Sequence, residues 1–93
     1  MTKREKRLAA LTRFADHGQG AVRWQDLVAV LEDMGFTADK SGGSHFTFIN
    51  LESPGRDAIS AVVKPHPQNE VKRYVAKKIV KFLRGKDYIG ESS

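Results

Sequence analysis

The chain has 93 residues and no cysteine, which is the size of one domain and excludes disulfide bonds and thiolate metal sites. No apolar run approaches the roughly 20 residues of a membrane-spanning helix, and no apolar signal core follows the basic N-terminus. We therefore expect a single domain in the reducing cytoplasm, with no membrane segment.

The formal net charge of +5 is spread unevenly along the chain. Residues 64–86 contain eight Lys or Arg and one acid, whereas residues 24–39 contain four acids and no base. Phosphates that are neutralised by basic side chains release their counterions, so the C-terminal part is expected to attract a polyanion such as a nucleic acid. A solvated basic helix with no ligand would carry the same charge.

Two helices are predicted in the first third of the chain. Thr2 and Glu5 match a capping box, which opens a helix over about residues 3–15, and the segment from His17 to Gly20 ends it. A second helix is expected over residues 24–34, with Gly35 after its end. Its apolar face comprises Trp24, Leu27, Val28, Leu31 and Met34.

Three strands are predicted next, over residues 36–40, 44–50 and 58–63, with turns at 41–43 and 52–57 between them. The middle strand alternates, so Phe46 and Phe48 point to one face of the sheet. His45, Thr47 and Ile49 then point to the other face. We expect the phenylalanine face to meet the helices.

A last helix is predicted after the Pro65-His66-Pro67 loop, because each proline removes an amide donor and restrains the preceding residue. Asn69 is the candidate N-cap and Gly85 the expected end. The apolar stripe comprises Val71, Val75, Ile79, Phe82 and Leu83. A separate basic stripe comprises Arg73, Lys77, Lys81 and Arg84.

This order of elements predicts an α+β domain. The economical packing is a three-stranded antiparallel sheet with two helices on one face, plus an extra N-terminal helix. We expect an N-terminal helical extension over residues 1–20, the domain proper over 21–86 and a frayed tail over 87–93.

His45 is the principal candidate for catalysis. Its imidazole is expected on the open face of the sheet, just after the Gly43-Ser44 pair, where the backbone leaves room for a ligand. Imidazole can take or give a proton near neutral pH, as phosphodiester cleavage requires. His66, in its stiff loop, is a candidate for orienting phosphate or for a second proton transfer. An exposed strand histidine and an incidental loop histidine explain the two positions as well.

Other chemistries find little support in the sequence. It contains no H-E-x-x-H motif, no His cluster at ligand spacing and no G-x-x-x-x-G-K-[ST] loop, so we expect neither a metal site nor a nucleotide cofactor. Trp24, Phe46 and Phe48 are able to stack on bases, but their periodicity favours the core.

Several segments together resemble the HicA (YcfA-like) toxin family over about residues 22–84. They are Trp24–Leu27, Leu31–Phe36, Gly43-Ser44-His45, Pro65-His66-Pro67 and the lysine-rich last helix. The chain departs from the family pattern at Ser41-Gly42, where many members carry Lys or Arg, and at Phe46, where a second histidine is frequent.

The resemblance implies a fold like that of the double-stranded-RNA-binding domain, and a ribosome-independent mRNA interferase. It also implies an acidic HicB-type antitoxin that covers the active site. His45 inherits the family's essential role, and His66 a supporting one. The RNA-binding set is then Gly43, Ser44, Lys64, Arg73, Lys77, Lys81 and Arg84.

The sequence therefore favours a cytoplasmic, metal-independent endoribonuclease that acts on single-stranded or locally open mRNA. A non-catalytic RNA-binding domain of the same fold explains the charge and the helices equally well. A pure interaction module, whose basic helix docks an acidic protein, is the third interpretation.

Overall fold

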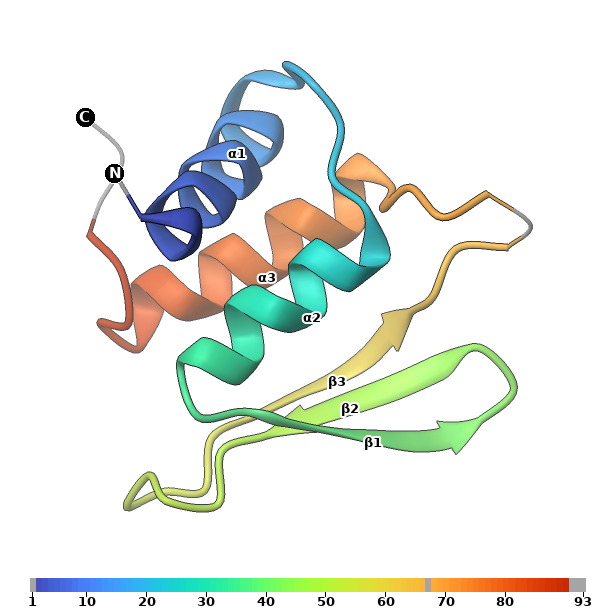
Figure 1. Ribbon diagram of the computed structural model, residues 1–93. Helices are drawn as coiled ribbons and strands as arrows, with labels where there is room; N and C mark the ends of the chain where they lie inside the picture. The colour runs from blue at the N-terminus through green and yellow to red at the C-terminus, as the bar shows by residue number, and fades with distance from the viewer. Residues whose placement is uncertain (1, 67, 91–93) are drawn as a thin grey trace.

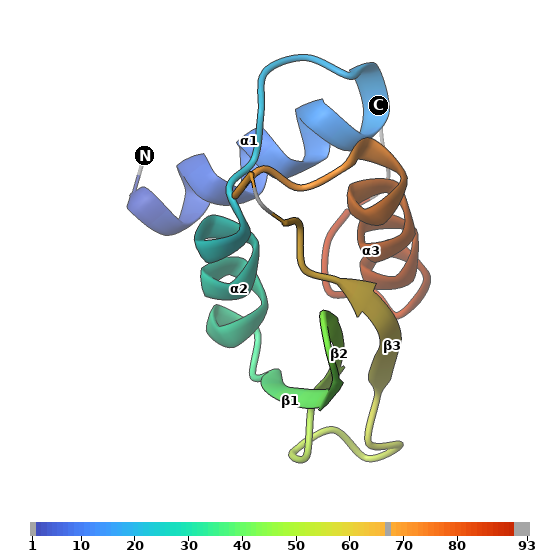
Figure 2. The same cartoon turned by 90° about the vertical axis from the view of Figure 1, so that its right-hand side faces the viewer.

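The computed structural model describes residues 2–66 and 68–90. The elements are α1 (Lys3–His17), α2 (Trp24–Asp33), β1 (Thr37–Gly42), β2 (His45–Ile49), β3 (Ala58–Val63) and α3 (Arg73–Gly85). The strands form one antiparallel sheet in the order β1-β2-β3. Helices α2 and α3 cover one face of this sheet, and α1 lies across them on the side away from it (Figures 1 and 2). The predicted α+β class and antiparallel meander are confirmed, consistent with the double-stranded-RNA-binding-domain-like fold of the resemblance.

Helix α1 begins with the predicted cap, although only half of the capping box forms. The Thr2 hydroxyl accepts a hydrogen bond from the Glu5 backbone N–H at 3.2 Å and donates to the Glu5 carboxylate at 3.2 Å. The helix runs two residues beyond the expected Ala15 and ends at His17. Gly18 follows with φ +68°, and its N–H donates to the Phe14 carbonyl, which is the left-handed C-cap that glycine favours.

The hairpin turn between β1 and β2 begins two residues later and ends one residue later than predicted. It occupies Gly43 and Ser44, because β1 continues through Gly42, which pairs with His45. A register irregularity between Lys40 and Gly42, with φ +132° at Gly42, lets the strand extend this far. Strand β2 accordingly begins at His45, and not at the expected Ser44.

Strand β3 has the predicted bounds and also carries a bulge that periodicity did not reveal. Phe46 pairs with Val62 and Phe48 with Ile59, so β3 has one residue more than β2 between these pairs. Ala61 absorbs the extra residue at φ +58°. Ile59 and Val62, three residues apart, are consequently both buried.

The prediction that Asn69 caps the last helix was wrong. The Asn69 carbonyl accepts from the Trp24 N–H at 2.9 Å, and the Val71 N–H donates to the Val22 carbonyl at 2.7 Å. This short antiparallel pairing of residues 69–71 with 22–24 uses the backbone groups that a helix would need. Helix α3 therefore begins at Arg73, with Lys72 as N-cap. Its buried side chains are Val75, Ala76, Ile79, Val80 and Leu83.

Of the expected tail over residues 87–93, the structure describes 87–90, and residues 91–93 lie outside the described part of the chain. The Tyr88 ring packs on Phe36 with 5.1 Å between centroids. Its hydroxyl donates to the Asp57 carboxylate at 2.8 Å and accepts from the Asn50 amide at 2.9 Å. Aromatic packing and two side-chain hydrogen bonds thus hold Tyr88 against residues that flank the strands.

We expect Ala61→Gly to raise the free energy of unfolding by about 0.5–1 kcal/mol, because it relieves a left-handed conformation that costs an L-residue roughly 1–2 kcal/mol. Ala58→Gly is the matched control, since Ala58 is exposed on the same strand without a positive φ. The control should lower stability by a similar amount. Urea denaturation followed by circular dichroism measures the free energy of unfolding of both variants. If Ala61→Gly lowered it as much as Ala58→Gly does, the backbone strain assigned to Ala61 would be contradicted.

Tyr88→Phe should lower the free energy of unfolding by about 1–3 kcal/mol, because the half-buried hydrogen bonds to Asp57 and Asn50 are lost, the first of them to a carboxylate. Burial, and then the hydrogen bond to Asp57, raise the pKa of Tyr88 above its usual value. The folded protein therefore retains the phenolic proton more tightly than the unfolded chain. The stabilisation is complete below about pH 10 and is lost as the pH rises through the folded pKa. Denaturation between pH 7 and pH 11 should show a steeper alkaline loss in the wild type than in Tyr88→Phe; parallel profiles would contradict this linkage.

Candidate functional site

His45 lies at the start of β2 and is exposed. Helices α2 and α3 cover one face of the sheet and leave the other face open (Figure 2). Phe46 and Phe48 point to the face that the helices cover, and their rings lie 5.2 and 6.0 Å from the Trp24 ring of α2. Phe48 is fully buried, so it can only point toward the helices. Strict alternation along β2 then directs the imidazole away from the core, as predicted.

The turn before His45 leaves its backbone accessible. A side chain built at Gly42 or Gly43 would meet no atom within 4 Å, and the two residues have φ values of +132° and +53°. Glycine is therefore used here for its backbone conformation, and the space above the turn stays open. A phosphate or ribose can approach the main chain at this point without displacing a side chain.

Lys64 is brought beside the same turn by β-pairing. Val63 pairs with His45, and the Lys64 N–H donates to the Ser44 carbonyl at 2.8 Å. One group of residues therefore gathers at one end of the sheet, and we call it the His45 corner. It consists of Gly43, Ser44, His45 and Lys64. His66 is exposed two residues further along the same loop, and Pro67 lies outside the described residues.

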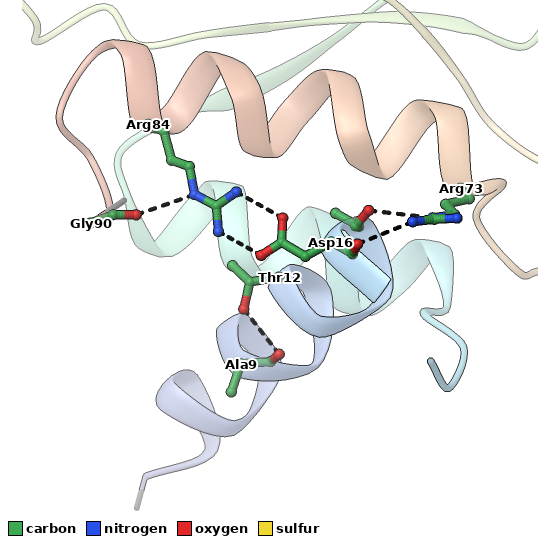
Figure 3. A network of polar contacts seen from close by, with 7 residues as sticks. Ala9, Thr12, Asp16, Arg73, Arg84 and Gly90 are labelled. Atoms are coloured by element: carbon green, nitrogen blue, oxygen red, sulfur yellow. Dashed lines mark hydrogen bonds and ion pairs between the residues drawn. The ribbon is translucent and has the colours of Figure 1, made fainter. Parts of the chain in front are cut away.

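The predicted basic stripe on α3 divides into two kinds of residue. Arg73 donates to the Ala15 and Asp16 carbonyls at 3.3 and 3.1 Å. Arg84 makes two hydrogen bonds of 2.8 Å to the Asp16 carboxylate and one of 3.2 Å to the Gly90 carbonyl (Figure 3). Both arginines thus hold the C-terminal end of α1 against α3, and an RNA-binding role for them stays a prediction.

Lys77 and Lys81 are exposed, and neither has a hydrogen-bond or ion-pair partner among the described residues. Lys78, which sequence reasoning did not select, donates to the carbonyls of Ser60 and, at 3.4 Å, Ala61. Sequence reasoning also passed over Tyr74 as a surface residue. Tyr74 precedes Lys77 by three residues and Lys78 by four, and this spacing makes the three side chains neighbours on a helix surface. That spacing was the signal in the sequence that could have drawn attention to Tyr74.

The His45 corner and the basic stripe do not share a face. Alternation along β2 directs His45 to the face of the sheet opposite to α3. The lysines belong to α3, which lies in the helical layer on the other face (Figures 1 and 2). Strand β3 lies at the edge of the sheet, between β2 and the flank of α3 that carries Lys78. A ligand that touches both must therefore pass around β3.

Metal-ligating side chains are scattered over the structure. Within residues 2–66 and 68–90, no group of three or more His, Cys, Asp or Glu side chains is placed to hold a metal ion. In the same part of the chain, none of the helices combines the length and apolarity that crossing a membrane requires.

The comparisons with known proteins identify the family. A family model described as the HicA toxin of bacterial toxin–antitoxin systems matches residues 24–84, which is more than half of the chain. The chain belongs to the HicA toxin family. No curated protein and no solved structure matches it. Helix α1 precedes the matched residues, so the Asp16 pairing with Arg84 joins the family domain to a helix outside the match.

Arg84→Gln should lower the free energy of unfolding of this HicA toxin by about 1–3 kcal/mol. The Arg84 and Asp16 side chains are only 17% and 22% exposed, and the substitution removes a bidentate pair. Lys81→Gln is the matched control and should change stability by less than about 0.5 kcal/mol. Equal midpoints of thermal unfolding for the two variants would contradict the structural assignment of Arg84.

Proposed function

We propose that this HicA toxin is an endoribonuclease that cleaves mRNA without a metal ion, with His45 as its general base. The observation that carries the proposal is the His45 corner, where an exposed imidazole, an open glycine turn and Lys64 lie together at one end of the sheet. Family membership supports a toxin role, for which mRNA cleavage supplies a direct means.

The reaction follows from this arrangement. His45 accepts the proton of a ribose 2′-hydroxyl, and the 2′ oxygen forms a bond to the adjacent phosphorus. The bond from phosphorus to the 5′ oxygen breaks, which leaves a 2′,3′-cyclic phosphate on one fragment and a 5′-hydroxyl on the other. The leaving oxygen takes its proton from His66 or from water. A positioned base typically contributes about 10²–10⁴-fold to such a rate.

Lys64 has the second role in the proposed mechanism. As the pentavalent phosphorane forms, negative charge grows on the non-bridging oxygens, and a nearby ammonium group stabilises it. The hydrogen bond between the Lys64 N–H and the Ser44 carbonyl keeps this residue beside the turn. The open backbone of Gly43 and Ser44 provides the surface on which the phosphate rests.

Membership of a toxin–antitoxin family implies an antitoxin partner. We propose that this antitoxin is of the acidic HicB type and covers the His45 corner in the cytoplasm, where the mRNA is found. An acidic surface is suited to this task because it meets Lys64 and excludes phosphates from the same place.

His45→Ala should reduce the rate of RNA cleavage at least 100-fold while the fold is retained, since His45 is exposed. His17→Ala is the matched control, because His17 is an exposed histidine at the end of α1. This variant should cleave RNA at the wild-type rate. The assay follows fragments with cyclic phosphate ends by gel electrophoresis in excess chelator. Undiminished cleavage by His45→Ala would remove His45 from the mechanism. Wild-type protein that binds RNA and leaves it intact would favour the non-catalytic RNA-binding alternative.

A further inference from the structure

Tyr74 is an exposed aromatic side chain on a helix whose other large apolar residues are buried or half-buried. It is 61% exposed, and Leu51, at 62%, is the other large apolar side chain named as exposed among the described residues. Leu51 follows Asn50 in the loop between β2 and β3, whereas Tyr74 lies in the first turn of α3. Helical spacing places Lys77 and Lys78 directly beside the Tyr74 ring.

The surroundings of Tyr74 are strongly positive. No acidic residue occurs in α3, and Lys77 and Lys81 are without a partner in the described part of the chain. The groove between α1 and α3, which these lysines and Tyr74 line, contains one carboxylate, Asp16. Arg84 neutralises that carboxylate. An aromatic face beside unpaired cations is the combination that holds single-stranded nucleic acid.

The register between α3 and β3 places Tyr74 near the His45 corner. The helix runs antiparallel to the strand, because Lys78 reaches Ser60 and Ala61 while Lys86 lies 3.7 Å from Asp57. Tyr74 lies about 6 Å before Lys78 along the helix, and Val63 about 7 Å beyond the bulge at Ala61 along the strand. Tyr74 is therefore level with the end of β3 at which Val63 pairs with His45.

The edge of β3 favours a nucleic acid over a peptide as the occupant. A peptide that added a strand here would need the free main-chain groups of β3. Lys78 already binds the Ser60 and Ala61 carbonyls, and the bulge at Ala61 bends the edge. A polyanionic strand crossing this edge needs no main-chain pairing and meets the lysines instead.

We infer that a single RNA strand held at the His45 corner continues around the edge of β3 onto α3, where one base stacks on Tyr74 and phosphates contact Lys77 and Lys81. This inference rests on the proposed function for the starting point of the strand. It adds a second subsite on the helical layer, so a longer RNA binds more tightly than one that fills the His45 corner alone.

The test measures RNA binding in a His45→Ala background, in which cleavage does not interfere. Fluorescence anisotropy compares oligonucleotides of about four and about sixteen nucleotides, the range of single-strand binding sites. The test variant adds three substitutions to this background, Tyr74→Ala, Lys77→Gln and Lys81→Gln. Its Kd for the longer RNA should rise about 10–100-fold, so that the longer RNA loses most of its higher affinity relative to the shorter one. The slope of log K against log salt should fall by about 1.4, as expected for two phosphate contacts.

The matched control carries Leu51→Ala, Lys3→Gln and Lys6→Gln, which remove one exposed apolar side chain and two exposed lysines elsewhere. Equal losses in test and control, or no loss in the test variant, would overturn the inference. The inference would also be overturned if the test variant no longer bound a co-expressed acidic antitoxin but kept the RNA affinity of its His45→Ala background. Failure of the proposed function has a different signature, because the wild type would then leave RNA intact while the length-dependent binding persists.

Discussion

The packing of Phe46 and Phe48 on Trp24 is the contact on which the position of the candidate site depends. A strand presents alternate residues to opposite faces, so burying Phe48 settles where every other side chain of β2 points. A slip of one residue would bury the imidazole of His45 and expose the phenylalanines. Each aromatic contact of this kind adds about 0.5–1.5 kcal/mol to the free energy of burial, which makes the alternative register strongly unfavourable. The exposure of His45 is therefore a consequence of core packing.

The electrostatics of α3 depend on a helix outside the matched family domain. Leu11 and Ala15 of α1 are buried in the core, and this packing brings Asp16 to Arg84 and the end of α1 to Arg73. Two of the four cations in the basic stripe are thereby committed to the fold. The positive field that remains belongs mainly to Lys77 and Lys81, which line the groove between α1 and α3, and Lys81 also lies on the flank of α3 toward β3.

The bulge at Ala61 links the sheet to this flank. It allows Ile59 and Val62 both to enter the core, and it turns the Ser60 and Ala61 carbonyls toward Lys78. The bulge at Ala61 therefore shapes the core, bends an edge strand away from pairing, and lets Lys78 of α3 bind the strand that carries Val63.

Much of this protein follows from local pattern in the sequence. The α+β class, the three strands, the orientation of His45 and the separate basic stripe were predictable, because helical and strand periodicity are properties of neighbouring residues. Residues distant in sequence decided the rest. Asn69 pairs with Trp24 instead of capping a helix, Arg84 meets Asp16 across 68 positions, and Tyr88 returns to Asp57. No periodicity encodes such partners, since they arise only when the chain has closed its core and polar groups at the new interfaces must find hydrogen bonds.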